Sequence, residues 1–132
     1  MIFVDTSAWF ACVAPKDPNH QKAMEWCKNN SETLITTDYI IDETLSLLKA
    51  RGQIEVAISM GEAFFKNGLS AVHFLTRDEI LISLDIFCKY NDKEWSFTDC
   101  TSKCIMDRLS IKKAFSFDRH FIQFGSIQVF PD

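Results

Sequence analysis

The sequence has little glycine, little proline and no long apolar run. Four Gly and three Pro residues in 132 argue against long disordered tracts, and 47% apolar with 24% charged residues is ordinary for a globular protein. A chain of this length is most simply one domain, residues 1–132. The longest early uncharged run, residues 6–15, is too short to span a bilayer, and no basic segment opens a signal peptide. We therefore expect a cytoplasmic protein without a membrane anchor.

Several familiar chemical signatures are also missing. The five cysteines are odd in number and scattered, which indicates reduced thiols rather than a disulfide framework. Cys100 and Cys104 lie one helical turn apart, but no other Cys or His pair has a matching spacing, so core packing is favoured over zinc binding. Neither G-x-G-x-x-G nor a Walker A sequence is present, which leaves a nucleotide-binding enzyme unsupported.

Apolar runs typical of strands alternate with helical segments. Strands are expected at Ile2–Val4, Leu34–Ile35, Ala71–Leu75, Ala114–Phe117 and Ile127–Phe130, the last at an edge. Helices are expected after Asp5, at His20–Asn29, from an Asp38 cap to Gly52, at Gln53–Asn67, at Asp78–Tyr90 and from Thr98. This alternation predicts a single-domain α/β sandwich, with a mainly parallel central sheet of about five strands and helices on both faces.

Acidic residues occupy the positions where such a sheet places its functional sites. Asp5 follows the first strand, and Asp118 follows the fourth. Asp99 opens a helix that is apolar almost all round, which indicates a buried helix. Because the carboxyl ends of parallel strands lie at one edge of the sheet, we expect these three carboxylates to lie close together.

A fourth carboxylate, Glu43, lies on an amphipathic helix. The apolar stripe of that helix is formed by Ile40, Ile41, Thr44, Leu45, Leu47 and Leu48. At about 100° per residue, Glu43 falls on the border of the stripe and Asp42 on the opposite side. Periodicity thus makes Glu43 a partly buried carboxylate, although a surface residue at the stripe edge fits the same spacing.

Four neighbouring carboxylates indicate a divalent metal site. They would repel one another and raise their pKa values unless a hard cation such as Mg²⁺ or Mn²⁺ balanced them. Without these four, the acidic count falls from 18 to 14, which equals the basic count of 14, so they account for the net charge of −4. Such ions can hold a phosphodiester and lower the pKa of a bound water, and no side-chain nucleophile is then needed.

Other polar residues have weaker signals. His120, beside Asp118, fits either proton transfer or a surface position, and the surface position is favoured. His73 lies in an expected strand and has a structural interpretation. In the helix Asp78–Tyr90 the periodicity turns four apolar residues inward: Ile80, Leu81, Leu84 and Phe87.

Four short motifs, in their order and spacing, resemble the PIN-domain ribonucleases over essentially the whole chain. They are Phe-Val-Asp-Thr-Ser at residues 3–7, Ile-Ile-Asp-Glu-Thr-Leu-Ser-Leu-Leu at 40–48, Ser-Phe-Thr-Asp-Cys at 96–100 and Phe-Ser-Phe-Asp-Arg-His-Phe at 115–121. The length resembles VapC-type toxins of toxin–antitoxin pairs. The resemblance implies a PIN-like fold, a metal-dependent endoribonuclease acting on RNA, a cognate antitoxin protein that blocks the site, and often a homodimer.

The resemblance also implies residue roles. The metal-binding and catalytic carboxylates would be Asp5, Glu43, Asp99 and Asp118. Ser7 would support the first carboxylate, and Thr98 would be the hydroxyl residue that precedes the third. The segment before Asp118 reads Phe-Ser-Phe, where a more hydrophobic strand ending in Thr is commoner in the family.

Asp107 competes with Asp118 for the fourth position, but it lies eight residues beyond Asp99 on the same helix, about 12 Å along its axis. An ion pair with Lys103, four residues earlier, is the simpler interpretation of Asp107, so Asp118 is favoured. We expect Lys103, Arg108 or Arg119 to contact the RNA backbone, with ordinary exposed side chains as the alternative.

Two other functions use the same residues. One is a catalytically silent PIN-like module that binds RNA or protein, and the intact carboxylate set argues against it. The other is a metal-dependent phosphatase or DNA nuclease, which differs only in its substrate.

Overall fold

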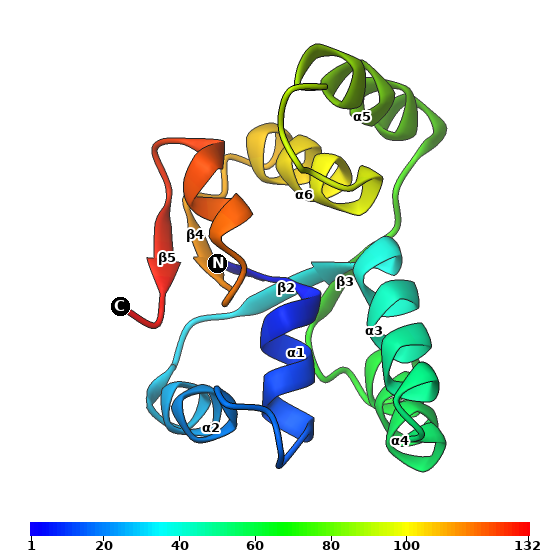
Figure 1. Cartoon of the computed structure of the whole chain (residues 1–132), viewed down its shortest axis with the longest axis vertical. Helices are drawn as coiled ribbons and strands as arrows, with labels where there is room; N and C mark the ends of the chain where they lie inside the picture. Colours follow the sequence, from blue (N-terminus) through cyan, green and yellow to red (C-terminus); the bar gives the residue numbers. More distant parts are fainter.

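Five strands form one sheet in the middle of the computed structural model, which describes residues 1–132 (Figure 1). The strands are β1 (Ile2–Val4), β2 (Leu34–Thr37), β3 (Ala71–His73), β4 (Lys113–Phe115) and β5 (Gln128–Phe130). Their order is β3-β2-β1-β4-β5, and every neighbouring pair is parallel. β1 is central and wholly buried, as expected of a strand covered on both faces. The predicted α/β fold is confirmed, with β5 at an edge.

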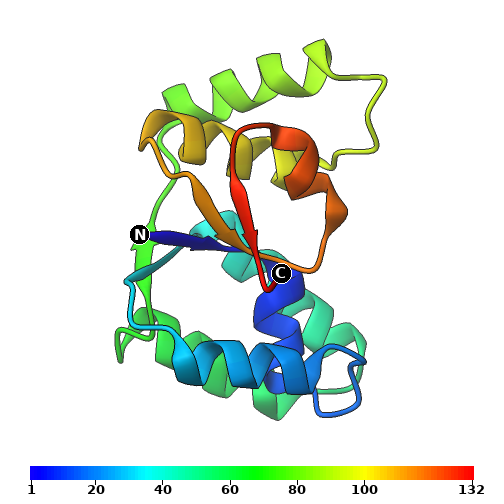
Figure 2. The same ribbon diagram turned by 90° about the vertical axis from the view of Figure 1, so that its left-hand side faces the viewer.

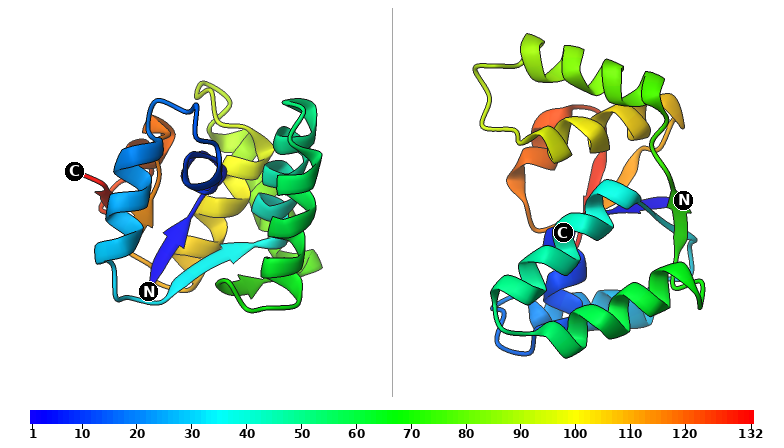
Figure 3. Two further views of the ribbon diagram at one scale, coloured as in Figure 1. Left: turned by 90° about the horizontal axis from the view of Figure 1, so that it is seen from below. Right: turned by 90° about the vertical axis from the view of Figure 1, so that its right-hand side faces the viewer.

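Helices cover both faces of the sheet. They are α1 (Thr6–Val13), α2 (His20–Asn29), α3 (Asp38–Ala50), α4 (Ile54–Phe65), α5 (Arg77–Lys89), α6 (Phe97–Arg108) and the short 3₁₀ helix η1 (Arg119–Phe124). The edge view places α5 and α6 on one side and α1, α2 and α4 on the other (Figure 2). α3 and α4 run side by side (Figure 3). None of these helices has the length and apolar character needed to span a membrane.

Helix caps fix where the site residues begin their helices. Asp5 caps α1, and Ser96 caps α6, which begins at Phe97, one residue before the expected start at Thr98. The predicted cap of α3, Asp38, is wrong: the Thr37 hydroxyl caps it, accepting a 3.1 Å bond from the Ile40 amide. Asp38 is the first residue of the helix, and its carboxylate accepts a 3.0 Å bond from the Leu75 amide.

The predicted inward face of α5 is also wrong. Leu81, Leu84 and Phe87 are 49%, 46% and 44% exposed, whereas Glu79 and Ser83 are buried. The reason is that α5 packs mainly on α6 through the side that carries Glu79: the Cys104 thiol of α6 donates a 3.6 Å bond to the Glu79 carbonyl, and Arg108 lies 3.8 Å from the Glu79 carboxylate. The helical period identifies the apolar face of this helix, but it does not determine which face the fold buries.

Candidate active site

The first carboxylate, Asp5, lies between β1 and α1 and is only 4% exposed. Its Oδ1 atom accepts bonds from the Ser7 hydroxyl at 2.7 Å and from the Ala8 amide at 3.2 Å. Burial raises the pKa of this carboxyl from 3.8 to about 7, although bonds from Ser7, Ser116 and Ala8 lower it and the charge of Asp118 raises it further. A buried carboxylate with such a pKa is poised to share a proton or a cation.

Ser116 joins the carboxylates at the ends of β1 and β4. Its hydroxyl donates a 2.9 Å bond to Asp5 Oδ2 and accepts a 2.9 Å bond from the Asp118 amide. Ser7 adds a second connection, because its hydroxyl accepts a 2.9 Å bond from the Phe117 amide. The expected support of Asp5 by Ser7 is therefore present in the structure, and the chain leaving β4 is tied to the start of α1.

Asp99 lies in the first turn of α6 and takes part in a capping box. Its Oδ2 atom accepts a 2.9 Å bond from the Ser96 amide, and its own amide donates a 3.0 Å bond to the Ser96 hydroxyl. This reciprocal pair holds the carboxylate at the amino end of a buried helix, where the helix dipole favours negative charge.

Asp118 and His120 complete one side of the group. Asp118 caps η1, with Oδ1 accepting a 2.9 Å bond from the His120 amide. His120 Nδ1 lies 3.0 Å from Asp99 Oδ2 and 3.4 Å from Asp118 Oδ1. One ligand atom from each of these three side chains lies within 4.8 Å of the others, a spacing that suits a metal ion.

Glu43 faces the same group from α3. It is half-buried while Asp42 is exposed, as its place on the stripe border indicated. Burial raises the pKa of Glu43; the Thr6 hydroxyl lowers it, and the charges of Asp99 and Asp118 raise it again. The four carboxylates predicted from the sequence are thus brought together from β1, α3, α6 and the β4–η1 connection.

The donor set fits a hard divalent cation. It consists of carboxylate oxygens with one imidazole, and burial and mutual repulsion disfavour ionisation of Asp5 and Glu43 without a positive partner. Asp107 lies outside this group: it is 60% exposed at the side chain and pairs with Lys103 at 3.0 Å.

The remaining predicted residues lie in different surroundings. The hydroxyl that holds Asp99 belongs to Ser96, while the Thr98 carbonyl accepts bonds from the following turn of the helix. Arg108 lies 3.8 Å from Glu79, at the opposite end of α6 from Asp99. Arg119 is exposed, directly after Asp118, and lines a polar recess of about 340 Å³ with His120 and with Asp92, Lys93, Glu94 and Gln123.

Two site residues were missed by reasoning from the sequence. His120 was assigned to the surface, yet its ring lies between two carboxylates, and the expected surface role is wrong. Ser116 was noted only because the segment Phe-Ser-Phe before Asp118 is less hydrophobic than is common in the family. The signal that could have found both is position, because each lies two residues from Asp118 in the short turn after β4.

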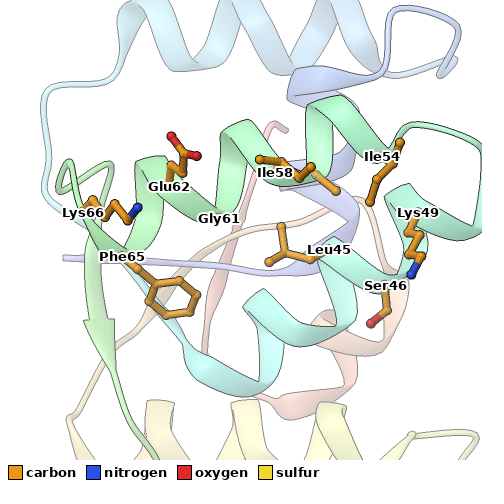
Figure 4. A pocket seen from close by; sticks show the side chains of 10 residues that line it. Leu45, Ser46, Lys49, Ile54, Ile58, Gly61, Glu62, Phe65 and Lys66 are labelled. Atoms are coloured by element: carbon orange, nitrogen blue, oxygen red, sulfur yellow. The ribbon is translucent and has the colours of Figure 1, made fainter.

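An apolar groove between α3 and α4 is separate from the carboxylates (Figure 4). The side chains of Leu45, Ile54, Ile58 and Phe65 line it, with Lys49 and Lys66 near its ends. Its lining has one carboxylate, Glu62, and no second acidic residue, His or Cys with which Glu62 could hold a metal ion. The groove therefore fits a partner surface better than a catalytic site.

Fold and site together define a carboxylate-based nuclease domain, and residues 2–126 match the PIN domain family. The chain belongs to this family, and the resemblance seen in its motifs is confirmed.

The relatives agree. The chain is 29% identical over 132 residues, all of both proteins, to the 23S rRNA-specific endonuclease VapC20 of Mycobacterium tuberculosis. The crystal structure of that protein, described as a sarcin-ricin loop cleaving toxin, superposes with a TM-score of 0.92 at 27% identity and covers 99% of this chain and 100% of that one. A VapC ribonuclease of Archaeoglobus fulgidus is 29% identical over 124 residues, covering 89% of this chain and 77% of that protein.

Proposed function

We propose that this chain is a metal-dependent endoribonuclease and the toxin of a toxin–antitoxin pair. The observation that carries the proposal is the meeting of Asp5, Glu43, Asp99 and Asp118 at the carboxyl ends of the central strands. The relatives that cover the chain are named as RNA endonucleases. Among RNAs, ribosomal RNA is the substrate to test first.

The mechanism follows from the donor set. When bound, Mg²⁺ or Mn²⁺ would lower the pKa of a water and supply positive charge to the phosphodiester. Asp99 and Asp118 would hold the ion, and Asp5 and Glu43 would complete its shell or accept the proton of the attacking water. In that reaction the water oxygen would bond to phosphorus as the bond from phosphorus to the leaving ribose oxygen breaks, and the leaving oxygen would take a proton from solvent.

Arg119 is the basic residue best placed to hold the RNA backbone, because it is exposed and follows Asp118 directly. Lys103 and Arg108, the other two candidates, each have an acidic neighbour in the structure. Arg119→Ala should lower the salt slope of RNA binding by about one, and Arg108→Ala should lower it less. An equal slope in the wild type and Arg119→Ala would remove Arg119 from this role.

The partner proposals rest on the family. A cognate antitoxin would block the site, and a second copy would form a homodimer. Two exposed apolar surfaces are available to them: the groove between α3 and α4, and the outer face of α5 with Leu81, Leu84 and Phe87. Light scattering of the purified chain measures its oligomeric state directly.

The deciding experiment is cleavage of total cellular RNA with Mn²⁺, Mg²⁺ or chelator. The wild type is compared with Asp99→Asn and with Asp107→Asn, which changes an exposed carboxylate on the same helix. We expect metal-dependent cutting by the wild type and Asp107→Asn and none by Asp99→Asn. Equal cutting by all three proteins would refute the site. No cutting together with no stabilisation by Mn²⁺ would favour the catalytically silent binding module.

A further inference from the structure

His120 contributes the only nitrogen donor to the carboxylate group. Its side chain is 20% exposed, and its Nδ1 atom lies 3.0 Å from Asp99 Oδ2 and 3.4 Å from Asp118 Oδ1. A carboxylate site for Mg²⁺ needs oxygen ligands alone, so the mechanism above gives this imidazole no task.

The backbone holds the ring in this place. The His120 amide donates a 2.9 Å bond to Asp118 Oδ1, and this bond caps the amino end of η1. His120 therefore donates a hydrogen bond to one carboxylate through its amide and faces two carboxylates with its ring.

We propose that His120 Nδ1 is a ligand of the divalent ion held by Asp99 and Asp118, and that it biases the site toward Mn²⁺ and Co²⁺ over Mg²⁺. This inference rests on the proposed metal-dependent nuclease. The ligand atoms of the three side chains already lie within 4.8 Å of one another. Affinity for an imidazole nitrogen rises along the first transition series from Mn²⁺ to Co²⁺, whereas Mg²⁺ prefers oxygen and sheds water reluctantly.

A different role for His120 makes a different prediction. If Nδ1–H only donates a hydrogen bond to the two carboxylates, the ring orients the ligands without touching the ion. Loss of an orienting group weakens every ion alike, because all of them use the same carboxylates. Loss of a nitrogen ligand weakens Mn²⁺ and Co²⁺ selectively.

Calorimetric titration of the metal-free protein with Mg²⁺, Mn²⁺ and Co²⁺ separates these roles. The variants are His120→Ala and, as a matched control, His20→Asn, whose ring lies 2.7 Å from the Ala11 carbonyl, away from the carboxylates. We expect His120→Ala to lose about tenfold or more in affinity for Mn²⁺ and Co²⁺, much less for Mg²⁺, and His20→Asn to bind like the wild type. Equal losses for all three ions would overturn the proposal and leave an orienting role.

Electron spin echo spectroscopy of the Mn²⁺-loaded protein gives a second readout that does not depend on activity. A coordinated imidazole produces a nitrogen modulation, which should appear in the wild type and His20→Asn and vanish in His120→Ala. Mn²⁺ bound without that modulation would overturn the proposal while leaving the metal-dependent nuclease standing. A wild type that binds none of the three ions would overturn both.

Discussion

Replacing Asp5 by Asn should stabilise the metal-free protein at alkaline pH. Asp5 is buried, and its ionised form has no cation beside it when metal is removed. Asn keeps the size and one acceptor oxygen but carries no charge, and the Ser7 and Ser116 hydroxyls can rotate to bond it. The proposed catalytic carboxylate would then be a source of instability that a bound metal ion would remove.

The magnitude follows from the pKa of Asp5. Burial raises it from 3.8 to about 7, so the folded state favours the protonated form. The associated stability is fully present below the pKa of the unfolded chain and is lost as pH rises through the folded value. At about 1.4 kcal/mol per pKa unit, protonated Asp5 contributes about 4 kcal/mol to the free energy of unfolding. About 2 to 3 kcal/mol of this contribution is lost between pH 5 and pH 8.

Urea unfolding in chelator at pH 5 and pH 8 measures this difference. We expect the stability of Asp5→Asn relative to the wild type to rise by about 2 to 3 kcal/mol between the two pH values. Asp107→Asn, at an exposed carboxylate, should track the wild type at both. A relative stability of Asp5→Asn that does not change with pH would refute the reasoning, as would a wild type that Mn²⁺ fails to stabilise at pH 8.

Three further changes test other parts of the structure. Ser116→Ala removes the hydroxyl that joins Asp5 to the Asp118 amide, so the initial rate of RNA cleavage should fall at least about tenfold. Ser59→Ala, at an exposed serine, should cleave at the wild-type rate. Glu79→Ala should cost about 3 kcal/mol in urea unfolding, because the buried carboxylate bonds to His73 and to the Thr76 amide. Lys103→Ala breaks an ion pair with exposed Asp107 and removes a mostly buried stem whose ammonium lies 5.9 Å from the centre of the Phe124 ring, so it should cost about 1 kcal/mol in urea unfolding.

The sheet and the carboxylates were predictable because both follow from short-range patterns. Apolar runs such as Ile2–Val4 specify a buried strand, and a residue directly after such a strand, such as Asp5, must lie at the carboxyl edge. Glu43 needed only the helical period to be placed half-buried. Neither placement required knowledge of which distant residues are in contact.

The outward face of α5 was not predictable in the same way. Its apolar residues have the helical period, but the fold buries the side that carries Glu79. That choice depends on contacts with residues outside the helix: Glu79 pairs with His73, the last residue of β3, and faces Arg108, the last residue of α6. Periodicity within one helix contains no information about such partners.

Ser7, Ser116 and His120 form a second group of site residues with a common spacing. Each lies two positions from a carboxylate, Ser7 after Asp5, and Ser116 and His120 on either side of Asp118. Asp5 and Asp118 each lie just after a strand and cap the helix that follows, so residues two positions away can reach the same carboxylate. Here all three contact a carboxylate through a side-chain atom or bond its neighbouring amide. The strand ends determine where Asp5 and Asp118 lie, and the residues two positions away determine what holds them, so a change of length between strand and helix would keep the carboxylates and lose their support.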